Sequence, residues 1–168
     1  KYADCIKYFK ANPIPREKLL IKNGYGRTLL HIALSKGCSN IEFLKLLIIP
    51  EVLTMVDKYL VTPVHFALWR HYSLEIIKLL TTPDVLVTVN NEGLTTLHYA
   101  LWMKLNNDFI KFLYTPKVLT IPGGITGTPL HYALWKNYSL EIIKLLTTPD
   151  LLVTVNGRGE TPLHLALW

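Results

Sequence analysis

An all-α solenoid of stacked helix pairs is the fold class that the sequence predicts, and three observations predict it. An eight-residue motif recurs five times along the 168 residues. Its histidines are separated by 34, 33, 33 and 33 residues, and a fixed period of this length is typical of a chain that stacks one small unit. Between the motifs, apolar residues recur at the three- and four-residue spacings of an amphipathic helix. The copies are TLLHIALS (28–35), TPVHFALW (62–69), TTLHYALW (95–102), TPLHYALW (128–135) and TPLHLALW (161–168).

The first helix of each unit begins at the motif, as residues 128–136 illustrate. Thr128 is a favourable N-cap, and Pro129 falls at the first helical position, where its missing N–H costs nothing. Leu130 and Leu134 then mark one buried face, and the polar residues from Lys136 onward end the helix.

A second helix and an extended arm complete the predicted unit. Ser139 caps the second helix, and Glu141 suits the positive charge at its N-terminal end. Thr148-Pro149 is expected to stop this helix. Residues 151–155 then predict an extended arm, since they are mostly β-branched or aliphatic, and the sequence Asn-Gly-Arg-Gly at 156–159 predicts a tight turn.

These residues resemble the ankyrin repeat, whose marker is T-P-L-H-x-A in a period of about 33 residues. The resemblance covers nearly the whole chain. It implies antiparallel helix pairs with hairpin-like loops projecting from one side, and it implies that the chain binds other macromolecules. Leu60 and Thr126 depart from the pattern, because they replace a glycine that the other copies carry as Gly26, Gly93 and Gly159. We therefore expect loop shape and curvature to differ from the family average.

The resemblance implies one ankyrin-repeat domain over residues 1–168. Residues 1–22 form the C-terminal part of a repeat, the segments 23–56, 57–89, 90–122 and 123–155 are repeats, and 156–168 begin another. Neither end shows a polar cap, so we expect a fragment of a longer chain with further repeats or domains on both sides. Residues 62–93 and 128–159 differ at only seven of 32 positions, two of them at a loop tip, which indicates duplication of a two-repeat block.

Composition narrows the class of protein. Half of the residues are hydrophobic and 18% are charged, but no apolar run reaches the roughly 18 residues of a membrane span. Residues 1–22 carry most of the net charge of +6, because they contain six basic and two acidic residues. A helix exposed to solvent accounts for this concentration of charge. Cys5 and Cys38 lie far apart, which fits a reducing compartment, so we expect a cytoplasmic or otherwise intracellular protein.

The motif histidines predict a structural role and no metal. Equivalent residues of stacked helices lie about 8–10 Å apart, whereas zinc ligands lie about 2 Å from one centre. In Thr-Pro-x-His the imidazole falls at N3, where it can bond back to the threonine as in a capping box. No pattern of catalytic residues is present, and Gly123-Gly124 is weak evidence for phosphate binding. We expect no enzyme activity, no metal and no cofactor.

A column of tryptophans is the candidate binding surface. Each tryptophan stands four residues after its motif histidine and flanks the predicted core stripe, so the column can face a groove for a protein partner. Packing of each indole against the next helix is the alternative, and base stacking with nucleic acid is a third. The candidate residues are Trp69, Trp102, Trp135 and Trp168 with Tyr99, Tyr132, Arg70, Met103 and Lys136. If the indoles are buried, the loop tips become the better candidates: Tyr25, Tyr59, Glu92, Ile125 and Arg158.

The sequence thus predicts a non-enzymatic protein-binding or scaffold module. We expect the tightest contact at Trp102, in the middle of the column, because central anchors are shielded from water. A nucleic-acid-binding groove is an alternative, which a steep fall of affinity with salt would reveal. A purely architectural segment, buried in a larger assembly, is the other.

Overall fold

A computed structural model describes the backbone of residues 2–167 and the side chains of residues 3–167. Within this range the chain forms 15 short α-helices and one 3-10 helix and contains no β-strand, so the predicted all-α class is confirmed. The chain divides into two compact units, residues 1–85 and 86–168. Each unit is described by itself.

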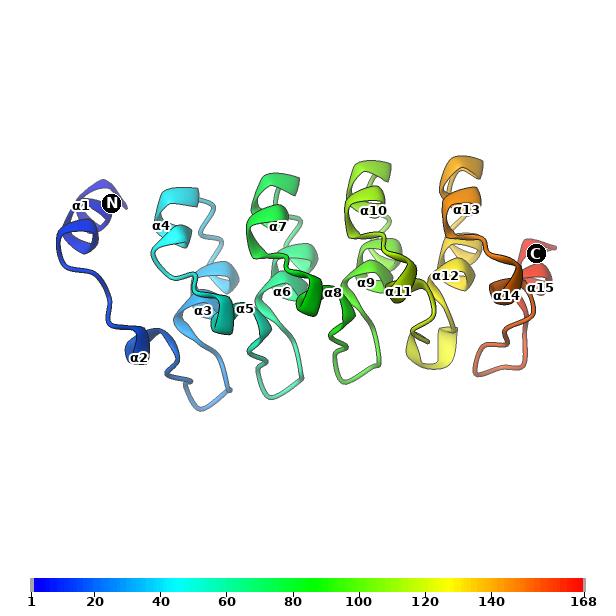
Figure 1. The fold of residues 1–168 in the computed structure, drawn as a ribbon, viewed down its shortest axis with the longest axis horizontal. Coiled ribbons are helices and arrows are strands. Elements are labelled where there is room, and N and C mark those ends of the chain that lie inside the picture. Colours follow the sequence, from blue (N-terminus) through cyan, green and yellow to red (C-terminus); the bar gives the residue numbers. More distant parts are fainter. Residues whose placement is uncertain (1, 168) are drawn as a thin grey trace. The chain divides into compact units, whose positions relative to one another are not determined.

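Unit 1 consists of helix pairs joined by short helices and loops (Figure 1). Helix α3 packs on α6, α6 packs on α7 and on α5, and α1 packs on α4. The loops that precede α3 and α6 project away from α4 and α7. The helices are α1 (Tyr2–Ala11), α2 (Arg16–Leu19), α3 (Leu29–Ser35), α4 (Ile41–Lys45), α5 (Pro50–Thr54), α6 (Pro63–Trp69), α7 (Leu74–Leu80) and α8 (Pro83–Val87), in which the boundary between the units falls.

Unit 2 repeats this order of elements. Helix α12 packs on α9, α13 and α15, while α10 packs on α9 and α13. The core is made of leucine and isoleucine side chains from these helices, with Leu97, Leu101 and Ile110 fully buried. The elements are α9 (Thr96–Trp102), α10 (Asn107–Leu113), α11 (Pro116–Leu119), η1 (Gly124–Thr126), α12 (Pro129–Trp135), α13 (Leu140–Leu146), α14 (Pro149–Leu152) and α15 (Pro162–Ala166).

Motif threonines start the first helices, as predicted. Thr128 is the extended N-cap of α12, and its side chain and backbone N–H both pair with His131 in a capping box. The same box starts α3, α9 and α15. In α6 the Oγ1 of Thr62 lies 2.7 Å from Nδ1 of His65. The predicted structural role of the motif histidine is therefore confirmed at all five copies.

Left-handed backbone ends the same helices. Gly37 has φ of 78° just after α3, and the equivalent positions have φ between 51° and 54° although they carry side chains. A side chain in this conformation costs about 1 kcal/mol relative to glycine. The non-glycine positions are His71, Lys104 and Asn137.

The predicted extended arm is wrong over most of its length. Residues 149–152 form helix α14, and the following Val153 has φ of −102° and ψ of −3°, so three of the five residues expected to be extended are not. Pro149, expected to act as a stop, occupies the first helical position of a new short helix after the extended Thr148. A proline forbids the helical conformation only to the residue before it and is itself preorganised for a helix start.

The loops between these elements are closed by backbone hydrogen bonds. In the loop 57–61, Asp57 N donates to Val61 O at 3.0 Å, and Leu60 adopts φ of 57°, so this loop keeps the hairpin-like shape despite lacking glycine. The loop 122–127 has a different shape, because it contains the 3-10 helix η1. The loops at Leu60 and Thr126 therefore differ from each other in shape, although both lack the glycine of the other copies.

The glycine pair of this unusual loop has a packing role. A Cβ on Gly123 would lie 2.4 Å from the ring of His98, and a Cβ on Gly124 would lie 2.4 Å from the carbonyl oxygen of Glu92. Close approach of the backbone therefore explains both glycines without a phosphate.

None of the helices that the structure describes combines the length and the apolar character that crossing a membrane requires.

Candidate functional site

Three tryptophans end the first helices and are half exposed. Their exposed fractions are 51% for Trp69, 41% for Trp102 and 51% for Trp135, whereas the leucines directly before the first two are fully buried. Each indole packs edge-on against the aromatic ring three residues earlier, with centroids 5.6–6.4 Å apart. The partial exposure that the groove hypothesis requires is thus found at these three positions, and none of the three is a core residue. Trp168 lies outside the described residues.

Cationic and polarisable side chains accompany these indoles as expected. The ammonium of Lys136 lies 4.3 Å from the ring centroid of Trp135, a cation–π contact that restrains both side chains. Arg70 is exposed after Trp69, and Met103 is half-buried after Trp102. Each candidate cluster is therefore accessible from solvent.

A cavity of about 120 Å³ lies beside Trp135 in unit 2. Its walls come from two sources, the helices α12 and α15 and the loops that precede them. A wider hollow of about 440 Å³ shares four of the lining residues with it, so the two adjoin. The residues that line the smaller cavity are Ile125, Thr126, His131, Tyr132, Trp135, Asn156, Arg158, Glu160 and Leu165.

The two sets of sequence-predicted candidates meet at this cavity. Tyr132 and Trp135 belong to the tryptophan column, while Ile125 and Arg158 belong to the loop tips that were considered as its alternative. The sequence did not show that one site contains both.

The loop walls are held in place by backbone contacts. Gly157 N donates to Ile125 O at 2.9 Å, and a Cβ on Gly157 would lie 2.6 Å from the side chain of Ile125. Asn156 Oδ1 accepts from the N–H groups of Arg158 and Glu160 at 2.9 and 3.0 Å. On the helix side, the hydroxyls of Thr126 and Tyr132 are hydrogen-bonded to each other. The walls are consequently preformed.

The only histidine in the cavity wall is fully engaged in hydrogen bonds. His131 Nδ1 accepts from Thr128 N at 3.1 Å, so the ring proton lies on Nε2, which is 3.1 Å from the carbonyl oxygen of Glu160. Burial lowers the pKa of His131 below its ordinary value, against smaller opposite effects of nearby carbonyls and Glu160. The imidazole is therefore neutral near pH 7 and has no nitrogen available for a ligand.

The remaining loop-tip candidates lie elsewhere. Tyr25 and Tyr59 are 56% and 49% exposed on neighbouring loops of unit 1. Glu92 is exposed in unit 2, where its N–H donates to Asn90 Oδ1 at 2.9 Å.

Sequence reasoning missed four of the residues that line the cavity. Leu165 stands at the variable position of the fifth motif, and this position could have been recognised, since it carries Phe66 and Tyr132 in other copies. The other three lie in loops whose side-chain directions depend on the turn geometry. They are Thr126, Asn156 and Glu160.

Groups of three or more side chains able to hold a metal ion are absent from the described part of the chain. Neither a scan against protein-family models nor a search of curated proteins finds a match to this chain.

Proposed function

We propose that the chain is an ankyrin-type solenoid and binds a segment of a protein partner at the Trp135 cavity. The motif and its period support the ankyrin type, together with the helix pairs and the threonine–histidine caps. Binding is non-enzymatic in this proposal and uses no cofactor.

The observation that carries the proposal is the half-exposed indole of Trp135 beside a preformed cavity. The cavity of about 120 Å³ can take one side chain of a partner, and the adjoining hollow of about 440 Å³ can take the residues beside it. Its apolar walls, Ile125, Trp135 and Leu165, favour an aliphatic or aromatic anchor. Arg158 in the cavity wall and Lys136, which lies against the ring of Trp135, favour acidic residues beside that anchor.

Peptide selection followed by substitution tests this function. A phage-displayed library of random peptides is selected on the whole chain, and the affinity of the enriched peptides is measured by fluorescence anisotropy. We expect Trp135→Ala to weaken binding by about 30-fold or more, the cost of losing an interface anchor. We also expect it to lower the free energy of unfolding by less than the roughly 3–5 kcal/mol of a deleted core tryptophan.

Trp69→Ala is the matched control, because Trp69 has the same motif position and the same exposed fraction of 51%. Peptides that bind Trp135→Ala and the unchanged chain equally well would contradict the proposal. Trp102→Ala tests the expectation that the middle of the column binds most tightly; the cavity favours Trp135 instead.

A further inference from the structure

A lysine is held between two exposed tyrosine rings in unit 1. The ammonium of Lys58 lies 4.5 Å from the ring centroid of Tyr25 and 4.9 Å from that of Tyr59. The backbone joins the same loops, because Lys58 N donates to Tyr25 O at 3.0 Å. We call these three residues the tyrosine–lysine cluster. Contacts with two rings restrain the lysine before any partner arrives.

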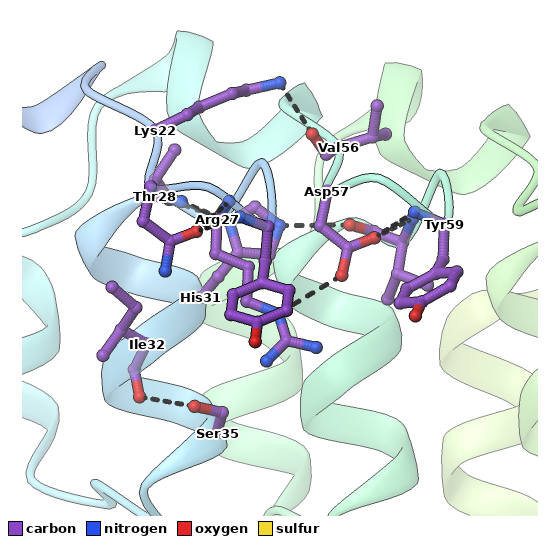
Figure 2. A network of polar contacts seen from close by, with 12 residues as sticks. Lys22, Arg27, Thr28, His31, Ile32, Ser35, Val56, Asp57 and Tyr59 are labelled. Carbon is purple, nitrogen blue, oxygen red and sulfur yellow. Dashed lines mark hydrogen bonds and ion pairs between the residues drawn. The ribbon is translucent and has the colours of Figure 1, made fainter.

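The carboxylate nearest in sequence does not neutralise this lysine. Asp57 is the only acidic residue in the loops 22–28 and 56–62, and its side chain is fully buried. Its Oδ2 accepts from Arg27 Nε at 3.3 Å, and its Oδ1 accepts from the N–H groups of Tyr59 and Val61 (Figure 2). The charge of Asp57 thus balances Arg27, and none of the ion pairs that the structure describes includes Lys58.

Four other cations of this unit, Arg27 among them, form ion pairs. Lys10 and Lys45 both contact Glu42, at 3.2 and 3.0 Å, and Arg16 contacts Glu51. A nucleic-acid backbone needs a succession of cations that follow its phosphates, whereas the tyrosine–lysine cluster holds a single lysine between its rings. The exposed Leu60 beside Tyr59 adds apolar surface.

We propose that the tyrosine–lysine cluster binds an acidic segment of a protein partner. A glutamate or aspartate of the partner accepts hydrogen bonds from Lys58, and an apolar residue beside it packs on the tyrosine rings and Leu60. This inference rests on the proposed function in that it names the chemistry of a protein partner, but it uses a surface separate from the Trp135 cavity.

Binding of a defined peptide tests this site. The probe is a fluorescein-labelled peptide of glutamates interrupted by one leucine, and its counterpart has glutamine in place of every glutamate. The whole chain is titrated at low salt and anisotropy is recorded. We expect the acidic peptide to bind, the glutamine peptide not to bind, and Lys58→Gln to weaken binding by about tenfold, as for a lost charge-assisted contact.

Lys36→Gln is the matched control, because it removes the same charge from an exposed lysine at the end of α3. Equal weakening by both substitutions would overturn the proposal, since it would reveal attraction by net charge alone. Failure of the acidic peptide to bind would overturn it as well. An oligothymidylate is titrated as well. If it binds more tightly than the acidic peptide and Lys58→Gln weakens its binding, the cluster is a nucleic-acid site and the acidic-peptide proposal is overturned.

Trp135→Ala separates this inference from the proposed function. If the cluster is a site, Lys58→Gln weakens binding of the acidic peptide by the same factor in the Trp135→Ala background as in the unchanged chain. Loss of acidic-peptide binding in Trp135→Ala with normal binding in Lys58→Gln would overturn the cluster and leave the cavity as the site. Circular dichroism of each variant checks that the helices are intact.

Discussion

At His31 and His131 the motif histidine links two successive copies of the motif through its two ring nitrogens. In unit 1, His31 Nδ1 accepts from Thr28 N at 3.3 Å, while Nε2 lies 3.1 Å from the carbonyl of Val61, the residue before the next motif (Figure 2). A backbone N–H can donate to Nδ1 only when that nitrogen carries no proton, so the neutral ring with its proton on Nε2 is required. Burial lowers the pKa of His31 to about 4.

Acid should therefore destabilise the fold in a defined window. Burial lowers the pKa of His98 to about 4 from 6.5, so the unfolded chain binds more protons than the folded chain between these values. The stabilisation is complete above pH 6.5 and is lost as the pH falls towards 4. By linkage we expect each such histidine to remove about 2–3 kcal/mol of unfolding free energy at a pH near 4.5. Urea unfolding at neutral and at acidic pH measures this loss of unfolding free energy.

Glutamine at position 98 is the matched variant, because it can complete a capping box but does not titrate. His98→Gln should lose less stability on acidification than the unchanged chain does. Equal losses would show that other groups cause the acid sensitivity. The carbonyl of Gly127 opposes the shift in the pKa of His98, but Nε2 makes no hydrogen bond within the described residues, so burial remains the main cause.

At the scale of elements, the sequence predicted where helices begin better than where they end. The motif threonines and prolines identified the first helices because capping is a local interaction. The short helix α14 was missed because a Thr-Pro pair is compatible with both a stop and a new start. The caps made by Tyr138 were also missed, since its hydroxyl donates to carbonyls more than 30 residues earlier, among them Leu105 O at 3.0 Å. A contact of that range has no local sequence signal.

The loop 122–127 should tolerate no side chain at Gly123. Gly123→Ala places a Cβ against the buried ring of His98, and overpacking of this kind costs about 1–3 kcal/mol. Gly24→Ala is the control, because a Cβ there meets nothing within 4 Å. Thermal unfolding of the two variants measures the difference. Equal stability of both would mean that the loop shifts without cost.

At the scale of the molecule, the helical class and the period predicted each helix pair but not the cavity. The cavity forms where Trp135 and Leu165 of successive motifs meet two loops, and only folded coordinates bring these together. The exposure of the indoles was also open in the sequence, because a residue that flanks a core stripe can face either the neighbouring helix or solvent.

Unit 2 exposes apolar side chains that should promote self-association. Leu163 is 60% exposed although Leu130, at the same motif position, is 1% exposed. Large contiguous apolar surfaces tend to be covered in solution. We expect light scattering to give a mass above 19.2 kDa that rises with concentration, and we expect Leu163→Glu to reduce it. A constant monomer mass over the micromolar range would contradict this. The other exposed residues are Leu140, Val153, Val155 and Leu167.

The loop-to-loop hydrogen bonds have a consequence for how such a chain can evolve. Lys58 N with Tyr25 O, and Gly157 N with Ile125 O, use backbone atoms alone. Substitution of the tip side chains at 25, 58 and 125 therefore leaves these bonds in place, while the identity of the tip changes freely. The near-copies 62–93 and 128–159 already differ at their tips, where Asn91-Glu92 stands against Gly157-Arg158. Substitutions at the loop tips can thus change the chemistry of this surface without altering the backbone contacts that hold the loops together.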